Sequence, residues 1–309
     1  MSAHTIPSPL PATRRSTFRR NRILWGYLFI APAILGLILF SFGPMLFSLV
    51  MSFFDWDVVR PPMFTGLKNY RMLVTEPLVL HSLKVTMQFT LLAVPLGNLF
   101  ALGIAMMLND RRIRFLSFFR TVFYIPTIAP AVASAILWTF MFNPMFGVLN
   151  GMLNALGLDS QGFIADPAQV IPCMAAMSIW SSGNAVIIYL AGLQGIPGQL
   201  YEALEVDGGN AWHQFRHVTL PLLSPIILYN VLMSMIGNLQ AFTQGYLMTG
   251  GGPENASLFY VLNLYNTAFK NSQMGFASAQ AWLMFVVVGI LTALSFWVSR
   301  RLVYYGDRA

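Results

Sequence analysis

The amino-acid sequence predicts an all-α integral membrane protein with six transmembrane helices and both termini in the cytoplasm. Of its 309 residues, 56% are hydrophobic and only 9% are charged, whereas soluble domains carry about 25% charged residues. Six apolar stretches are long enough to cross a bilayer, which takes about 20 residues each. Most of the net charge of +7 comes from arginines that flank these stretches. This pattern favours topology signals over a nucleic-acid-binding surface.

The expected spans divide the chain into one membrane domain and a short tail. They cover residues 23–46, 84–108, 118–142, 168–193, 222–248 and 274–299. The first apolar run, Ile23 to Phe54, is longer than the apolar core of a signal peptide, which has about 7–15 residues. We therefore expect this run to be a first transmembrane helix and not a cleaved signal. Residues 23–309 would form the membrane domain, and residues 1–22 a disordered cytoplasmic tail.

Positive charges predict the orientation of the spans. Thirteen Lys and Arg residues lie on or beside the segments that this topology places inside, and five lie outside. Because such residues concentrate in cytoplasmic loops, residues 109–117 and 194–221 are predicted to face the cytoplasm together with both termini.

The predicted cytoplasmic loop 194–221 holds three of the eleven acidic residues. Pro197 suits the start of a helix, and the pair Gly208-Gly209 suits its end, because glycine readily adopts left-handed backbone geometry. A second helix can restart at Ala211 and lead into the fifth span. This helix–turn–helix is either a docking site for a soluble partner or a juxtamembrane helix whose acidic side chains are simply solvated.

The same loop resembles the cytoplasmic signature of the membrane subunits of binding-protein-dependent ABC importers. That signature reads Glu-Ala-Ala, three residues, Gly, nine residues, Ile, one residue, Leu-Pro. This chain has Glu202-Ala203-Leu204, Gly208, Val218 and Leu220-Pro221 at the same spacing. It departs from the signature at Leu204, which replaces a small residue, and at Val218, which replaces isoleucine.

Further segments are similar to the carbohydrate-importing branch of that family, which includes the maltose and glycerol-3-phosphate systems. They are Phe64–Tyr70, Met248–Pro253, Ala268-Phe269 and Gly275–Ala279. The resemblance implies the type I importer permease fold, with residues 23–309 as an ABC transmembrane type-1 domain. It also implies a multi-pass protein of the bacterial inner membrane.

The resemblance implies a role and partners for the cytoplasmic loop. Residues 194–221 would be the coupling loop, docked in a cleft of an ATPase subunit. The implied coupling residues are Glu202, Ala203, Asp207, Gly208, Leu220 and Pro221. The implied partners are a second permease subunit (a paralogue or a second copy), a dimer of ATP-binding subunits, a periplasmic solute-binding protein and membrane lipid. ATP and Mg would be bound by the ATPase subunits, with no cofactor in this chain.

The sequence contains no catalytic or metal-binding pattern of its own. None of its three lysines follows a glycine, so the Gly-Lys-[Ser/Thr] sequence of a phosphate-binding loop is absent. His213 and His217, four residues apart, could supply two metal ligands, but the sequence shows no third ligand. We interpret them as polar loop residues and expect a transport subunit, not an enzyme.

Neutral polar side chains in the fourth and fifth spans are candidate solute-binding groups. They are Ser181, Asn184, Ser234, Asn238 and Gln240. Spacings of three and four residues place the first two, and likewise the next two, on a shared helix face. Such groups either hydrogen-bond to the hydroxyls of a sugar or link neighbouring helices, and the resemblance favours the sugar pathway for Ser234 and Asn238. We interpret Gln88 and Asn98 in the second span as packing groups.

The predicted function is that of a permease subunit of an ABC sugar importer, which forms the pathway for a carbohydrate or polyol derivative. The alternative is a self-sufficient secondary transporter of a small polar solute. Such transporters commonly carry an intramembrane carboxylate or cation site, and no Asp or Glu lies within the six expected spans. A membrane enzyme is a third possibility, for which the sequence offers no pairing of nucleophile and base. The solute could be neutral or charged.

Overall fold

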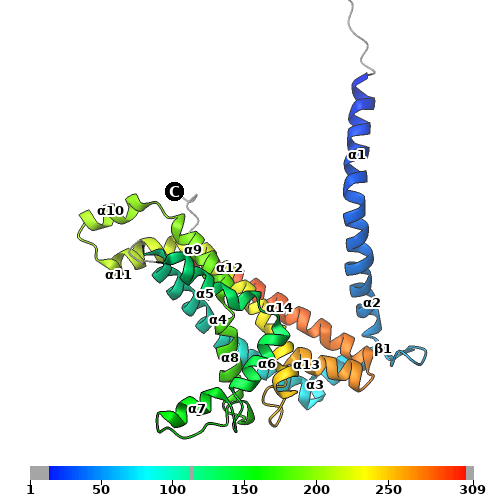
Figure 1. The fold of residues 1–309 in the computed structure, drawn as a ribbon. Coiled ribbons are helices and arrows are strands. Elements are labelled where there is room, and N and C mark those ends of the chain that lie inside the picture. Colours follow the sequence, from blue (N-terminus) through cyan, green and yellow to red (C-terminus); the bar gives the residue numbers. More distant parts are fainter. Residues whose placement is uncertain (1–13, 111–114, 304–309) are drawn as a thin grey trace, which may run out of the picture.

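The computed structural model describes residues 14–110 and 115–303, with side chains for residues 25–110, 115–300 and 303. Figure 1 shows a body of packed helices and one long helix that stands apart from it. In the described part, four helices are long and apolar enough to cross a bilayer, and two bent pairs raise the number to six. The strands of that part, β1 (Phe54–Asp55) and β2 (Met63–Phe64), form one short antiparallel pair.

The body contains the following helices in chain order. They are α3 (Lys68–Thr75), α4 (Pro77–Asn109), α5 (Leu116–Ile128), α6 (Ala131–Met141), α7 (Val148–Ala155), α8 (Val170–Trp180), α9 (Gly183–Gln194), α10 (Gly198–Val206), α11 (Ala211–Gln214), α12 (Leu220–Leu239), α13 (Tyr260–Tyr265) and α14 (Met274–Leu302), with short turns at η2 (Phe163–Ala165), η3 (Phe215–Thr219), η4 (Gly245–Thr249) and η5 (Asn266–Lys270). Figure 1 places α10 and α11 at one end of the body and α3, α7 and α13 at the other. In the predicted orientation these are the inner and outer ends.

The first span is the helix that stands apart. It consists of α1 (Arg14–Leu37), the π-helical turn η1 (Ile38–Phe42) and α2 (Gly43–Met51). Only 6% of the most apolar stretch of this span is buried within the chain, so these side chains face lipid or another chain. The predicted disorder of residues 1–22 is wrong for residues 14–22, which are helical. Residues 1–13 lie outside the described residues.

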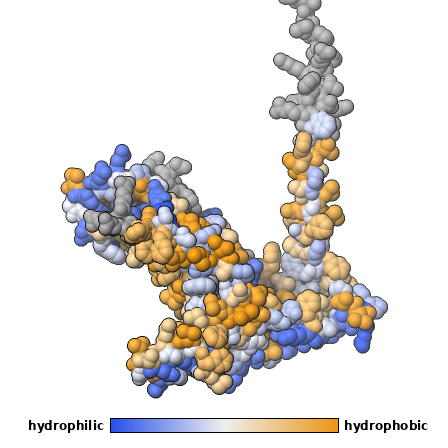
Figure 2. All heavy atoms as spheres, in the orientation of Figure 1, coloured by the Kyte–Doolittle hydropathy of each residue, from blue (hydrophilic) through white to orange (hydrophobic). Residues whose placement is uncertain are grey.

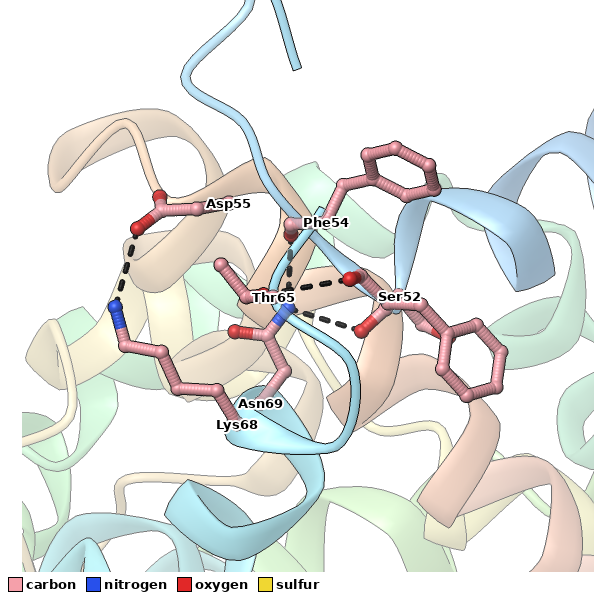
Figure 3. Close-up of polar contacts among 7 residues, drawn as sticks. Ser52, Phe54, Asp55, Thr65, Lys68 and Asn69 are labelled. Carbon is pink, nitrogen blue, oxygen red and sulfur yellow. Dashed lines mark hydrogen bonds and ion pairs between the residues drawn. The ribbon is translucent and has the colours of Figure 1, made fainter. Parts of the chain in front are cut away.

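A buried asparagine joins the end of the first span to the body (Figure 3). Asn69 is 4% exposed and donates from Nδ2 to the carbonyl oxygens of Ser52 and Phe54, each at 2.9 Å. Gly275 of α14 lies so close that a Cβ atom there would overlap the Phe54 carbonyl oxygen. Two of the segments similar to the carbohydrate branch therefore meet here, and both serve packing.

Helix α4 is the centre of the body. It packs against α8, α9, α12 and α13, and its side chains Phe89 and Ala101 are fully buried. Pro77 stands in its first turn, where the missing amide hydrogen costs no hydrogen bond. The expected span 84–108 lies within α4, which begins about two turns earlier at its outer end.

The third and fourth expected spans are each broken in two. Helices α5 and α6 meet at 99°, so residues 118–142 do not form one straight span. The break lies at Ala129-Pro130, where Ala129 is extended, because proline restricts its predecessor to that geometry. Helices α8 and α9 meet at 48°, and the residues at their break are Ser181 and Ser182.

The fifth span begins earlier and ends earlier than expected. Its helix runs without interruption through α11, η3 and α12, from Ala211 to Leu239. Residues 240–248, which the sequence assigned to the span, leave the helix and enter η4. At the helix end, the Gln240 and Ala241 amides turn back to carbonyls of Ile236 and Asn238. The sixth expected span, 274–299, lies within α14.

Candidate functional site

A central cavity of about 340 Å³ lies between α4, the break of α8 and α9, and α12. Four of the five predicted pathway residues line it: Ser181, Asn184, Ser234 and Asn238. The fifth, Gln240, does not line it, because it lies beyond the last turn of α12 and is exposed. No charged side chain lines this cavity in the described part of the chain. Its wall offers neutral amides and hydroxyls.

One wall of the cavity is a hydrogen-bonded chain across three helices. Asn98 Nδ2 of α4 donates to Ser234 Oγ of α12 at 2.9 Å, and Tyr189 OH of α9 donates to Asn98 Oδ1 at 2.7 Å. Ser234 Oγ in turn donates to the Asn230 carbonyl oxygen at 2.7 Å. Ser234 therefore links helices and also lines the cavity.

Asn98, which the sequence indicates to be a packing group, does bridge helices, and it also lines the cavity, which the sequence reasoning missed. A single amide in an apolar span is costly unless it is paired or faces a wet cavity. The cost of burying this amide was the feature of the sequence that could have indicated that Asn98 lines a cavity.

Several polar groups of the cavity wall keep hydrogen-bonding capacity. Asn184 is exposed to the cavity, and Asn238 Oδ1 has only a long contact of 3.4 Å from Ser178 Oγ. Ser182 Oγ is buried and has no partner within the described residues. Because an unmade hydrogen bond costs about 1–3 kcal/mol, these groups favour occupation of the cavity by a polar molecule.

At the inner end, α10 and α11 form the predicted helix–turn–helix. Gly208 has φ of +81°, and its amide donates to the Glu205 carbonyl oxygen at 3.0 Å, while Gly209 donates to that of Leu204 at 2.8 Å. This pair of bonds is a Schellman motif, which satisfies the last carbonyls of a helix. A Cβ atom on Gly209 would lie 2.7 Å from Leu204 Cγ. The residue that departs from the family signature thus packs beneath the turn.

Side chains hold the two arms of this loop together. Gln214 Nε2 donates to Glu205 Oε1 at 3.0 Å, and the hydroxyls of Tyr201 and Thr219 lie 3.0 Å apart. Asn210 Oδ1 accepts the His213 amide at 3.0 Å and caps α11. These contacts tie the two arms of the loop to each other.

The two histidines of this loop bond to their own turn. His213 Nδ1 lies 2.8 Å from Asn210 Oδ1, and His217 Nδ1 lies 3.1 Å from the His213 carbonyl oxygen. Within the residues that the structure describes, no group of three or more His, Cys, Asp or Glu side chains is placed to hold a metal ion.

The exposed surface of this loop combines acidic and apolar side chains. Glu202, Ala203 and Asp207 are exposed, and no described residue forms an ion pair or side-chain hydrogen bond with Glu202. Val206 and Trp212 are 88% and 62% exposed, and Figure 2 shows blue and orange patches at this end of the body. The sequence reasoning missed these two apolar groups, although large apolar side chains in a polar loop are a signal for docking.

The predicted loop residues after the turn lie on the continuous helix. Gly208 is exposed in the turn, Leu220 is 39% exposed at the start of α12, and Pro221 follows it half-buried. The structure thus gathers Glu202, Ala203 and Asp207 on α10 and its end, whereas Leu220 and Pro221 form the base of the second arm.

Comparison with known proteins gives consistent matches over almost the whole chain. The family model described as "Binding-protein-dependent transport system inner membrane component" matches residues 93–308. The probable ABC transporter permease protein YesP of Bacillus subtilis is 38% identical over 301 residues, covering 96% of this chain and 97% of that protein. The lactose transport system permease protein LacF of Rhizobium radiobacter is 34% identical over 299 residues, covering 94% and 99%.

A solved structure has the same fold. A chain of a bacterial ABC transporter involved in the import of the acidic polysaccharide alginate superimposes with a TM-score of 0.81, at 23% identity, over 94% of this chain and 100% of that chain.

Proposed function

Because this chain belongs to the family of inner membrane components of binding-protein-dependent transport systems, and is an ABC transporter permease rather than an enzyme, we propose that its solute is a carbohydrate or polyol derivative. Relatives named for sugar transport support this, among them the lactose permease LacF and the multiple sugar-binding permease MsmF of Streptococcus mutans. The fold supports an integral membrane protein of type I importer architecture. We place it in the bacterial inner membrane.

The observation that carries the proposal is the uncharged polar wall of the central cavity. Asn184, Ser234 and Asn238 present amides and a hydroxyl to one space, and each such group can both donate and accept a hydrogen bond. A sugar offers hydroxyls of the same dual kind.

The remaining subunits fit surfaces that this chain leaves uncovered. We assign the ATP-binding subunits, which carry ATP and Mg, to the exposed surface of α10 and α11 with Glu202 at its centre. A second permease subunit would cover part of the exposed first span, Trp25–Met51, and membrane lipid the rest. A solute-binding protein would deliver the solute at the outer end, where α7 and α13 lie. The solved alginate importer was studied with such a periplasmic protein bound.

The fold offers a direct route from the docking surface to the cavity. The helix that begins at Ala211 is the same 29-residue helix that ends at Leu239 and carries Ser234 and Asn238. Since α10 is hydrogen-bonded to this helix at Gln214 and Thr219, these contacts would transmit a movement of α10 to it. Closure of the ATPase subunits would thereby reshape the cavity wall.

The test is solute uptake by the complete importer in proteoliposomes. We expect uptake to require ATP inside and the binding protein outside, without any dependence on an ion gradient, which also separates this function from a secondary transporter. Asn238→Ala should lower uptake about two- to tenfold, the equivalent of one lost hydrogen bond. Gln240→Ala is the matched control outside the cavity. Uptake that survives removal of ATP would refute the proposal. Equal uptake by wild type and Asn238→Ala would show that the central cavity is not part of the solute pathway.

A further inference from the structure

A second cavity, of about 680 Å³, lies at the outer end of α4 and α8. From its position and charge we infer that it is the entrance chamber of the solute pathway and that Lys84 binds a carboxylate group of an acidic sugar there. This inference rests on the proposed function and names the solute class: a carbohydrate that carries a uronic acid.

The polar side of this chamber is one face of α4. His81, Lys84 and Gln88 line it, and their spacings of three and four residues stack them along the same face of the helix. Pro167 and Ile171, before and within α8, line the opposite side. Its volume lies within the about 300–1,000 Å³ of small-molecule sites.

Helices α4 and α8 line both cavities, and the fully buried side chains Phe89 and Met174 lie at the levels between them. On α4, Gln88 lines the outer chamber and Ala93 the central cavity, and five residues of helix span about 7.5 Å. On α8, the corresponding residues are Ile171 and Ser178. In the inferred pathway, a solute from the outer end would reach Lys84 and Gln88 before the neutral wall of the central cavity.

Lys84 brings a positive charge that the chamber does not balance. No Asp or Glu is among the residues that line it, and in the described part of the chain Lys84 forms no ion pair. Two other outer cations do form ion pairs: Lys68 with Asp55 at 3.2 Å, and Arg60 with Asp57 at 3.6 Å. A cleft lined by one sign of charge raises the local concentration of oppositely charged ligands.

The neighbours of Lys84 suit a sugar acid rather than a simple anion. Gln88, one turn further in, offers an amide to sugar hydroxyls. His81 Nε2 lies 3.0 Å from the Asn255 carbonyl oxygen, which can only accept, so this nitrogen carries the proton. That bond holds the loop around Ala256, which closes the chamber, against α4.

The test uses the complete importer with its binding protein in proteoliposomes, supplied with a hexuronic acid disaccharide or with its carboxyl-reduced, neutral counterpart. We expect Lys84→Gln to lower uptake of the acidic probe about three- to tenfold at subsaturating concentration, and to leave the neutral probe unaffected. Lys84→Arg should retain uptake, because it keeps the charge. Salt at 0.5 M should shrink the difference between wild type and Lys84→Gln, since the Debye length falls to about 4 Å.

Lys270→Gln is the matched control, because it removes an exposed outer lysine that lies over the Tyr246 ring, 5.9 Å from its centroid, and does not line the chamber. Preference of the wild-type importer for the neutral probe would overturn the inference and leave the proposed function intact. So would unchanged uptake in Lys84→Gln, equal losses for the two probes, or a loss in Lys84→Arg as large as in Lys84→Gln. Absence of ATP-dependent uptake of any solute by wild type would overturn the proposed function itself.

Discussion

The side-chain amide of Asn98 and the hydroxyl of Ser234 lie 2.9 Å apart and join α4 to α12 in the wall of the central cavity. The two residues are 136 positions apart in the chain. Because Asn98 also accepts from the Tyr189 hydroxyl at 2.7 Å, one amide links three helices at the central cavity.

We expect Asn98→Ala to destabilise the assembled importer. The change leaves the Tyr189 hydroxyl, in a side chain that is 1% exposed, without its acceptor, and such a loss costs about 1–3 kcal/mol. Thermal unfolding followed by tryptophan fluorescence in nanodiscs would measure it. Leu99→Ala, on the 67% exposed neighbour, is the control.

A double-mutant cycle sharpens this prediction. Tyr189→Phe removes the donor, so adding it to Asn98→Ala should cost less than it costs in the wild type. Strictly additive losses would mean that the two side chains do not interact in the membrane.

Gly208→Val should uncouple transport from ATP hydrolysis. Gly208 has φ of +81°, and left-handed geometry costs a residue with a side chain about 1–2 kcal/mol. The turn would shift the docking surface of α10, so ATP-driven uptake should fall while the protein still inserts and assembles. Gly208→Asn should retain more uptake, since asparagine tolerates this geometry better.

The control for this experiment is Gly198→Ala. Gly198 begins α10, and a Cβ atom there meets nothing within 4 Å. Wild-type uptake in Gly208→Val would show that the turn geometry does not matter for coupling.

Asn69→Ala and Gly275→Ala should each loosen the attachment of the first span. The first change removes both hydrogen bonds to the Ser52 and Phe54 carbonyl oxygens, at about 1–3 kcal/mol. The second forces the Phe54 backbone away from α14. Limited proteolysis at the outer loop and the melting temperature would report the change. Gly289→Ala is the control and should match wild type, because it lies on the same helix with no atom within 4 Å of the added carbon. Wild-type behaviour of Asn69→Ala and Gly275→Ala would show that these contacts do not hold the first span.

The orientation of the chain predicts the accessibility of single cysteines. After Cys173→Ser, Met145→Cys should react with an impermeant thiol reagent in spheroplasts, and Val206→Cys should react only after the membrane is opened. These side chains are each 88% exposed, so reactivity reports the side of the membrane. Labelling of position 206 but not of position 145 in sealed spheroplasts would show that the topology is the reverse of the predicted one.

Local features could be read from the sequence because short segments decide them. The number of spans, the membrane class and the helix–turn–helix at 194–221 depend on the composition and on nearby residues such as Gly208, whose left-handed geometry requires no distant contact. The spacing from Glu202 to Pro221 was therefore sufficient to predict the loop and to identify the family, which the comparisons confirm.

Only the tertiary structure decided which polar groups share a space. It places Ser181, Asn184, Ser234 and Asn238 on one cavity, adds Asn98, leaves Gln240 outside, and turns Lys84 towards a chamber. It also shows that the sharp break between α5 and α6 lies at Pro130, which the sequence does not single out because proline is common in membrane helices. The physical reason is the solvent: lipid tails are as apolar as leucine, so hydrophobic periodicity does not reveal which face of a span points inward. That rotation is set by contacts between helices far apart in the chain.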